Sequence, residues 1–143
     1  MNVIDVDEFP FLMSGLRKKF QNQVNKEMKE QSMSSAHVPY LLVLKRRDGI
    51  SLKEMTEVLN MNKAHTTRII ADLRLRGYVY TDCPKEGGKK FKVYLTDKGK
   101  VVAEKVYVLM SDIRDNIFSC LTQDECVQLK TIIDKLWANI GPI

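Results

Sequence analysis

Residues 51–77 read SLKEMTEVLNMNKAHTTRIIADLRLRG, and this stretch decides the fold of the chain. Ser51 is followed three residues later by Glu54, the spacing of a capping box, in which two side chains satisfy free N–H groups at a helix start. The pattern predicts a short helix up to residue 59, with its apolar side chains on one face. These side chains are Leu52, Met55, Val58 and Leu59.

A second helix is expected directly after a tight turn at 60–62. Asn62 is a favoured N-cap residue, and Gly77 is a favoured residue just past a helix end, so the spacing predicts a helix over 63–76. The residues expected on its buried face are Thr66, Ile69, Ile70 and Leu73. Two helices joined by so short a turn form a helix-turn-helix.

A β-hairpin is expected next, because two β-prone runs at 78–82 and 91–96 flank the segment CPKEGGKK at 83–90. A Gly-Gly pair between two such runs is typical of a hairpin tip. A hairpin that follows the second helix of a helix-turn-helix makes the unit a winged helix. In such a unit the second helix lies in the DNA major groove.

Apolar helices are expected on both sides of this unit. Apolar residues recur at steps of four from Leu12 to Met28, which predicts a first helix over 9–30 with Asp7 as its N-cap. Another helix is expected between that first helix and the helix-turn-helix. It carries the apolar run from residue 40 to 44 and stops at Asp48-Gly49. Two more helices are expected at about 96–119 and 122–140, the second of them opened by a capping box of Thr122 and Glu125.

Length and composition point to a single globular domain. The chain has 143 residues, of which 44% are hydrophobic and 29% are charged. No apolar run approaches the ~20 residues of a membrane-spanning helix, and the acidic N-terminus lacks the pattern of a secretory signal. Three cysteines without a Cys-x-x-Cys pair argue against a disulfide framework and a zinc site. We therefore expect a cytoplasmic protein with no membrane contact, no metal and no cofactor.

The positive charge lies in the middle of the chain. Between Lys45 and Lys100 there are fourteen basic and seven acidic residues, so this segment carries +7 while the rest carries −2. Such asymmetry favours a polyanionic partner for the segment. The alternative is a solvated surface that happens to be basic.

The exposed face of the second helix of the helix-turn-helix carries the candidate DNA contacts. They are Lys63, His65, Thr67, Arg68 and Arg74. Lysine and arginine can reach guanine edges or phosphates, and threonine can contact phosphates or thymine methyl groups. Four lysines of the hairpin could lie along the phosphates. They are Lys85, Lys89, Lys90 and Lys92.

Most of these residues also have an interpretation that involves no contact with DNA. Arg68 and His65 could be solvated helix residues, and cations near the helix end, Arg74 and Arg76, are favoured there by the helix dipole. Lys63 is different, because the dipole disfavours a cation in the first turn, and a phosphate partner would explain it better.

Taken together, these motifs resemble the multiple antibiotic resistance regulator (MarR) family of transcription factors. The resemblance rests on the motifs SLKEMTEVL at 51–59, Thr67-Arg68, Leu73-x-x-x-Gly77-Tyr-Val and Leu95-Thr-Asp-Lys-Gly99. The order of the flanking helices is similar too, so the resemblance covers nearly the whole chain.

The resemblance implies a mainly α fold with a small β-hairpin wing (α+β), in one domain over 1–143. The winged helix-turn-helix lobe would span 38–100, with helical dimerisation regions at 7–31 and 101–143. It implies a homodimer that binds a palindromic double-stranded DNA operator, commonly as a repressor released by a small-molecule inducer or by oxidation. Two-fold symmetry would place two recognition helices ~34 Å apart.

The wing departs from the family pattern. The family carries Asp-x-Arg or Asp-Arg-Arg before the second wing strand, where this chain has Gly87-Gly88-Lys89. Lysines could replace the wing arginine as point-charge contacts to phosphates, with less shape selectivity. The alternative is a wing that contributes little to binding.

His37 and Tyr40 are the candidate residues for inducer binding, because the family binds ligands between the dimer helices and the DNA-binding lobe. The alternatives are a structural role for His37 and core packing for Tyr40. A redox role stays open for the three cysteines, although the peroxide-sensing branch has its reactive cysteine near the start of the first helix, where this chain has none. The three are Cys83, Cys120 and Cys126.

The alternatives to a transcriptional regulator are an enzyme and a winged helix with another binding role. An enzyme is not expected, because the sequence has no Gly-rich phosphate loop, no His-Glu-x-x-His motif and no nucleophile elbow. A winged helix that mediates protein–protein contacts, or binds DNA without sequence preference, is the main alternative.

Overall fold

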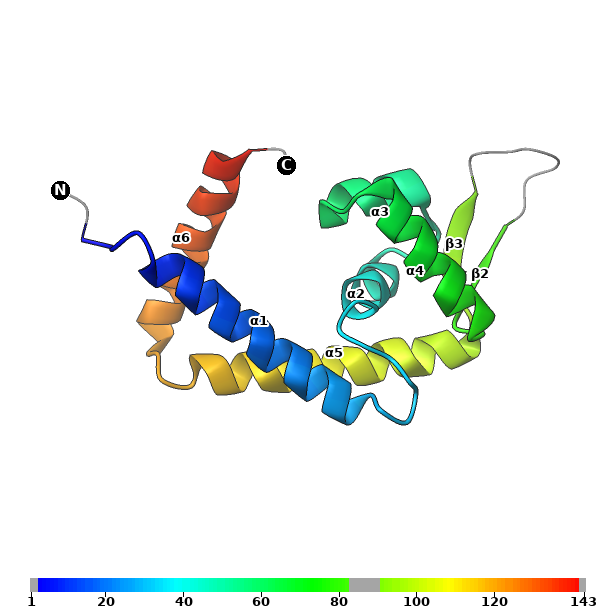
Figure 1. Ribbon diagram of the computed structural model, residues 1–143, viewed down its shortest axis with the longest axis horizontal. Coiled ribbons are helices and arrows are strands. Elements are labelled where there is room, and N and C mark those ends of the chain that lie inside the picture. Colours follow the sequence, from blue (N-terminus) through cyan, green and yellow to red (C-terminus); the bar gives the residue numbers. More distant parts are fainter. Residues whose placement is uncertain (1–2, 83–90, 142–143) are drawn as a thin grey trace.

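The structure is a computed structural model and describes residues 3–82 and 91–141. Within these ranges the chain forms six helices and one small antiparallel sheet (Figure 1). The elements in order are α1 (Glu8–Glu27), α2 (Val38–Arg46), β1 (Ile50–Ser51), α3 (Leu52–Leu59), α4 (Lys63–Leu75), β2 (Val79–Thr81), β3 (Lys92–Leu95), α5 (Asp97–Phe118) and α6 (Gln123–Ile140). The expected class, a mainly α winged helix-turn-helix, is confirmed.

Most of the expected helix caps are present. The Asn62 side chain accepts a hydrogen bond from the backbone N–H of His65 at 2.7 Å, and the Thr96 side chain accepts one from Gly99 at 2.9 Å. Thr122 and Glu125 form a complete capping box. These bonds fix the first turns of α4, α5 and α6 because they satisfy N–H groups that have no partner within the helix.

Two capping expectations are wrong in detail. Ser51 caps α3, but Glu54 does not return a bond to the backbone; its carboxylate accepts from the Ser51 hydroxyl at 3.0 Å and from Arg47 at 2.7 Å. Asp7 occupies the N-cap position of α1 without a side-chain capping bond. In both cases the carboxylate that the pattern assigns to capping makes no hydrogen bond to a backbone N–H at the helix start.

The first helix ends earlier than the apolar spacing predicts. α1 stops at Glu27, and the chain turns back through Ser32, which has a positive φ of 52°. The reversal places Met28 and Met33 in the core, with exposed fractions of 0% and 5%. Burial of two large apolar side chains outweighs continuation of the helix.

The sheet contains one strand more than expected. β3 lies between β1 and β2, so that Ile50 pairs with Val93 and Tyr80 pairs with Tyr94. A two-residue strand such as β1 is too short to leave a periodic signal in the sequence. The two wing strands are each shorter than predicted, and the expected hairpin tip at 83–90 lies outside the described residues.

α2 lies at the centre of the winged-helix lobe, between α3, α4 and the long helix α5 (Figure 1). Tyr40, Leu41 and Leu44 of α2 have no exposed surface. Residues from α4 and the sheet close the same core, among them Leu73 and Val93. α4 is therefore held by its inner face against the buried face of α2, whose last residues, Lys45 and Arg46, are exposed.

The helices α1 and α6, with the far end of α5, form an arm that extends away from this lobe. α5 runs from the wing to the far end of the molecule, where α6 turns back, and α1 crosses beside α5 (Figure 1). Within the described residues α6 contains no buried side chain. Most of its large apolar side chains, including Trp137 and Ile140, are exposed in the described part of the chain.

Gly99 is a position where the backbone of two elements must approach closely. A Cβ at Gly99 would lie 1.8 Å from the carbonyl oxygen of Tyr78, so Gly99→Ala should separate α5 from the segment that leads into β2. We expect a loss of about 1–3 kcal/mol or more in the free energy of unfolding, measured by thermal or urea denaturation. Gly15→Ala is the control, because a Cβ at Gly15 meets nothing within 4 Å, and it should not lower the melting temperature.

Candidate nucleic-acid interface

α4 presents opposite faces to the core and to solvent. Its inner face is the predicted one, Thr66, Ile69, Ile70 and Leu73, and all four are buried. The outer face consists of residues that the sequence analysis assigned to DNA. Lys63, Thr67, Arg68 and Arg74 are exposed, and His65 is half-buried. All five therefore lie on α4 outside its buried face, with His65 at the edge of that face, where its ring centroid is 5.9 Å from that of Tyr40.

Contacts within α4 orient two of these side chains. The Arg68 guanidinium lies 2.9 Å from Nδ1 of His65, and since arginine can only donate, Nδ1 accepts and the proton is on Nε2. The Thr67 hydroxyl donates to the carbonyl oxygen of Lys63 at 2.9 Å. The guanidinium of Arg68 is thus held near the first turns of the helix, and the Thr67 methyl group is free to face outward.

The wing is described only at its base. Lys92, on β3, is exposed, and its backbone N–H donates to the Asp82 carboxylate across the two strands at 2.5 Å. The rings of Tyr80 and Tyr94 stack beside this bond, with centroids 5.3 Å apart. The other predicted wing contacts, Lys85, Lys89 and Lys90, lie outside the described residues.

His37 and Tyr40 are both buried against α4. Tyr40 has no exposed surface, and its hydroxyl lies 3.2 Å from the hydroxyl of Thr66. His37 is 6% exposed, and its Nε2 lies 2.6 Å from a carboxylate oxygen of Asp72. Both side chains already have polar partners, so neither lies open to a ligand in this conformation.

Asp72 is a residue that the sequence analysis missed. Its carboxylate accepts from His37 and also from Nε of Arg76 at 2.8 Å. The hydrogen bond from His37, with that from Arg76, holds the pKa of Asp72 below its usual range. No local sequence pattern points to Asp72, because its partner His37 is 35 positions away in the chain.

A groove of about 790 Å³ lies between α2, α3 and α5. Its lining combines apolar side chains with four cations. The lining residues are Val38, Pro39, Leu42, Val43, Lys45, Arg46, Arg47, Val58, Leu59, Tyr107, Met110, Ser111 and Arg114. The groove therefore begins beside His37 and Tyr40 but is lined by their neighbours on α2.

Three of the four groove cations pair with carboxylates. Lys45 pairs with Glu104 at 2.9 Å, and its ammonium lies 5.0 Å from the centre of the Tyr107 ring. Arg47 pairs with Glu54 at 2.7 Å. Arg114 pairs with Asp115 at 2.9 Å, whereas Arg46 has no ion pair among the described residues.

The described residues were also compared with the expectations for metals, cysteines and membrane spans. No group of three or more potential metal ligands occurs among them. Cys120 is exposed and Cys126 is half-buried, while Cys83 lies outside the described ranges. No helix in the described part of the chain is long and apolar enough to cross a membrane.

The curated proteins that this chain is similar to include transcriptional regulators. No family model matches the chain. The chain is 27% identical over 116 residues to the HTH-type transcriptional regulator BilQ of Clostridioides difficile, a match that covers 81% of this chain and 73% of that protein. The resemblance seen in the sequence motifs therefore extends over most of the chain.

Solved structures of MarR regulators have the same fold. A MarR transcriptional regulator from Methanosarcina mazei Go1 matches with a TM-score of 0.84 and 23% identity, over 96% of this chain and 92% of that one. S. aureus MepR in a DNA complex matches with a TM-score of 0.82 and 13% identity, over 93% and 98%. The resemblance to MarR-family regulators is confirmed.

Proposed function

We propose, from its MarR-type winged-helix fold, that this chain is a transcriptional regulator that binds a palindromic DNA operator as a homodimer and is released by a small-molecule inducer. The observation that carries the proposal is the outer face of α4. Its basic and hydroxyl side chains face solvent together, while its inner face is anchored in the core. A helix mounted in this way can enter a major groove without disturbing the fold.

The chemistry of this face suits both parts of DNA recognition. Lys63 at the first turn and Arg74 further along can contact phosphates, which would position the helix. Arg68, oriented by His65, can donate two parallel hydrogen bonds to a guanine edge. Phosphate contacts release counterions, so affinity should fall steeply as salt rises.

The proposal is tested by selection from a random duplex library at two salt concentrations, followed by sequencing of the retained DNA. We expect a two-fold-symmetric motif and weaker retention at the higher salt concentration. Retention without a motif would indicate a nonspecific DNA-binding protein. Absence of retention at low salt would favour a protein–protein module and would contradict the proposal.

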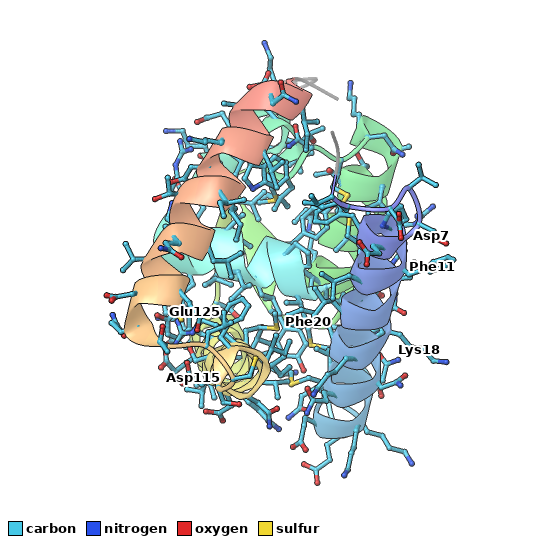
Figure 2. The ribbon with its side chains drawn as sticks, turned by 90° about the vertical axis from the view of Figure 1, so that its left-hand side faces the viewer. Asp7, Phe11, Lys18, Phe20, Asp115 and Glu125 are labelled. Carbon is cyan, nitrogen blue, oxygen red and sulfur yellow. The ribbon has the colours of Figure 1, made fainter. Side chains whose placement is uncertain are left out.

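Arg68→Ala should weaken binding to the selected operator by about 1–3 kcal/mol, or roughly 5- to 150-fold, and relax the preference at one base pair of each half-site. Binding is measured by fluorescence anisotropy. Lys18→Ala is the matched control, since it removes one positive charge from a side chain of α1 that points away from the rest of the molecule (Figure 2). Equal affinities of the two variants would contradict the role of Arg68.

The arm supports the proposed homodimer. Its exposed apolar side chains lie on α1 and α6, which Figure 2 shows on either side of the end of α5. Phe11 is 69% exposed, Trp137 57% and Ile140 59%. Large apolar residues with this exposure, here on two helices, are typical of an interface, and a second copy of the chain provides a matching surface across a two-fold axis.

Leu136→Asp should disrupt the dimer because it places a charge within this apolar face of α6. We expect the variant to sediment as a monomer at micromolar concentration and to lose at least about tenfold in operator affinity. Trp137 is the single tryptophan of the chain, so its emission reports burial of this face directly. Thr131→Asp, on the opposite face of α6, is the control and should remain dimeric.

The groove between α2, α3 and α5 supports the proposed response to an inducer. Its volume of about 790 Å³ is that of a site for a small organic ligand. The apolar lining, together with Arg46, which has no ion pair among the described residues, favours an amphipathic molecule with an acidic group. Because the groove lies between the lobe and α5, a ligand that prefers a different spacing of these elements would lower operator affinity.

We expect an aromatic carboxylate such as benzoate, at millimolar concentration, to weaken operator binding by the wild-type protein. Ser111→Phe should remove the response, because the larger side chain occupies the groove from α5. Benzamide, which lacks the negative charge, should act less than benzoate. An undiminished benzoate response in the Ser111 variant would contradict this location of the site.

A further inference from the structure

A chain of polar contacts joins α4 to the segment that follows α1. Nε2 of His37 lies 2.6 Å from Oδ2 of Asp72, and the same oxygen accepts from Nε of Arg76 at 2.8 Å. A second nitrogen of Arg76 donates to the carbonyl oxygen of Gln31 at 3.2 Å. We refer to these three side chains, His37, Asp72 and Arg76, with the Gln31 carbonyl, as the clasp.

The hydrogen bonds of His37 fix its tautomer. The backbone N–H of Ser34 points at Nδ1 from 3.1 Å, and a backbone N–H can only donate. Nδ1 is therefore the acceptor, and Nε2 carries the proton that is donated to Asp72. A neutral imidazole thus satisfies both of its nitrogens in a site where the ring is 6% exposed.

The clasp explains why an acidic residue is tolerated on the DNA-facing helix. A free carboxylate on α4 would repel phosphates, but Asp72 is turned toward His37 and Arg76 instead. Its charge is offset by the Arg76 guanidinium on the side of α4 that faces the loop after α1. The clasp therefore removes an unfavourable charge from the interface and uses it as an attachment point.

Packing alone does not define the rotation of α4. The apolar contacts of Ile69 and Leu73 are not directional, whereas hydrogen bonds depend on angle as well as distance. The clasp acts near the C-terminal half of α4, and the bond between Tyr40 and Thr66 acts near its N-terminal half. Two directional contacts at separate turns can set the rotation of a helix about its axis.

We propose that His37 is a positioning residue that, through Asp72, sets the orientation of the recognition helix relative to the end of α1. This inference rests on the proposed function. Gln31 and Ser34 belong to the segment directly after α1, the helix assigned above to the dimer. The clasp would therefore fix the spacing of the two recognition helices in the dimer and with it the operator spacing that the protein accepts.

The test compares three substitutions of His37 on the selected operator and on versions with one base pair added to or removed from its centre. Glutamine places an amide nitrogen near the position of Nε2 and can still donate to Asp72. Asparagine reaches only the position of Nδ1 and retains the bond from Ser34 but not the one to Asp72. His37→Gln is therefore the conservative rescue, and His37→Asn and His37→Ala break the clasp.

We expect His37→Asn and His37→Ala to bind the selected operator about tenfold more weakly and to lose most of their discrimination between the spacings. His37→Gln should keep the wild-type discrimination. Dimer formation, read from Trp137 emission, should be the same in all four proteins. Equal discrimination in the asparagine and glutamine variants, or a loss of affinity that follows melting temperature alone, would overturn the proposal.

The hydrogen bonds of the clasp can also be tested in the absence of DNA. ¹⁵N NMR of the wild-type protein should show His37 as the Nε2–H tautomer, and Asp72→Asn should perturb that signal. If the wild-type protein selects no DNA while the tautomer is present, the proposed function fails and the positioning role fails with it. If the wild-type protein binds an operator and the tautomer is absent, only the clasp is refuted.

Discussion

The packing of α4 against α2 is the interaction on which the rest of the structure depends. Tyr40, Leu41 and Leu44 of α2 are fully buried, and the inner face of α4 closes the core over them through Ile70 and Leu73. Because this face is apolar and the opposite face is basic, one packing arrangement both stabilises the lobe and presents cations to solvent. The candidate interface is thus a consequence of the core rather than an addition to it.

The arm differs from α4, because its apolar residues are exposed rather than packed in the core. α6 has apolar residues at helical spacing, but no other element buries them within the described residues, and Figure 1 shows α6 standing apart from the lobe. A small lobe cannot cover two long amphipathic helices that extend beyond it. The exposed apolar face that results is a strong physical argument for a second copy of the chain, and it links the proposed dimer to the same helices that carry the lobe.

Polar contacts restrict how the apolar elements of the lobe can be oriented relative to one another. The lobe holds a buried hydroxyl pair, Tyr40 with Thr66, and a histidine bonded to a carboxylate on α4. Such groups contribute less to stability than apolar burial does, but they are satisfied in only one arrangement. The two residues that the sequence singled out for a ligand, His37 and Tyr40, are those that make these contacts, while the groove opens beside them.

The sequence by itself determined the features that depend on residues three or four positions apart. The caps at Asn62, Thr96 and Thr122 and the buried face of α4 were all predictable, because N-capping and helical amphipathicity are local. Only the tertiary structure decided the reversal after Met28, the strand β1, the groove and the environment of His37. Each of these depends on contacts between residues far apart in the chain, as the 35 positions between His37 and Asp72 illustrate, and no local pattern records which distant side chain the fold will bring near.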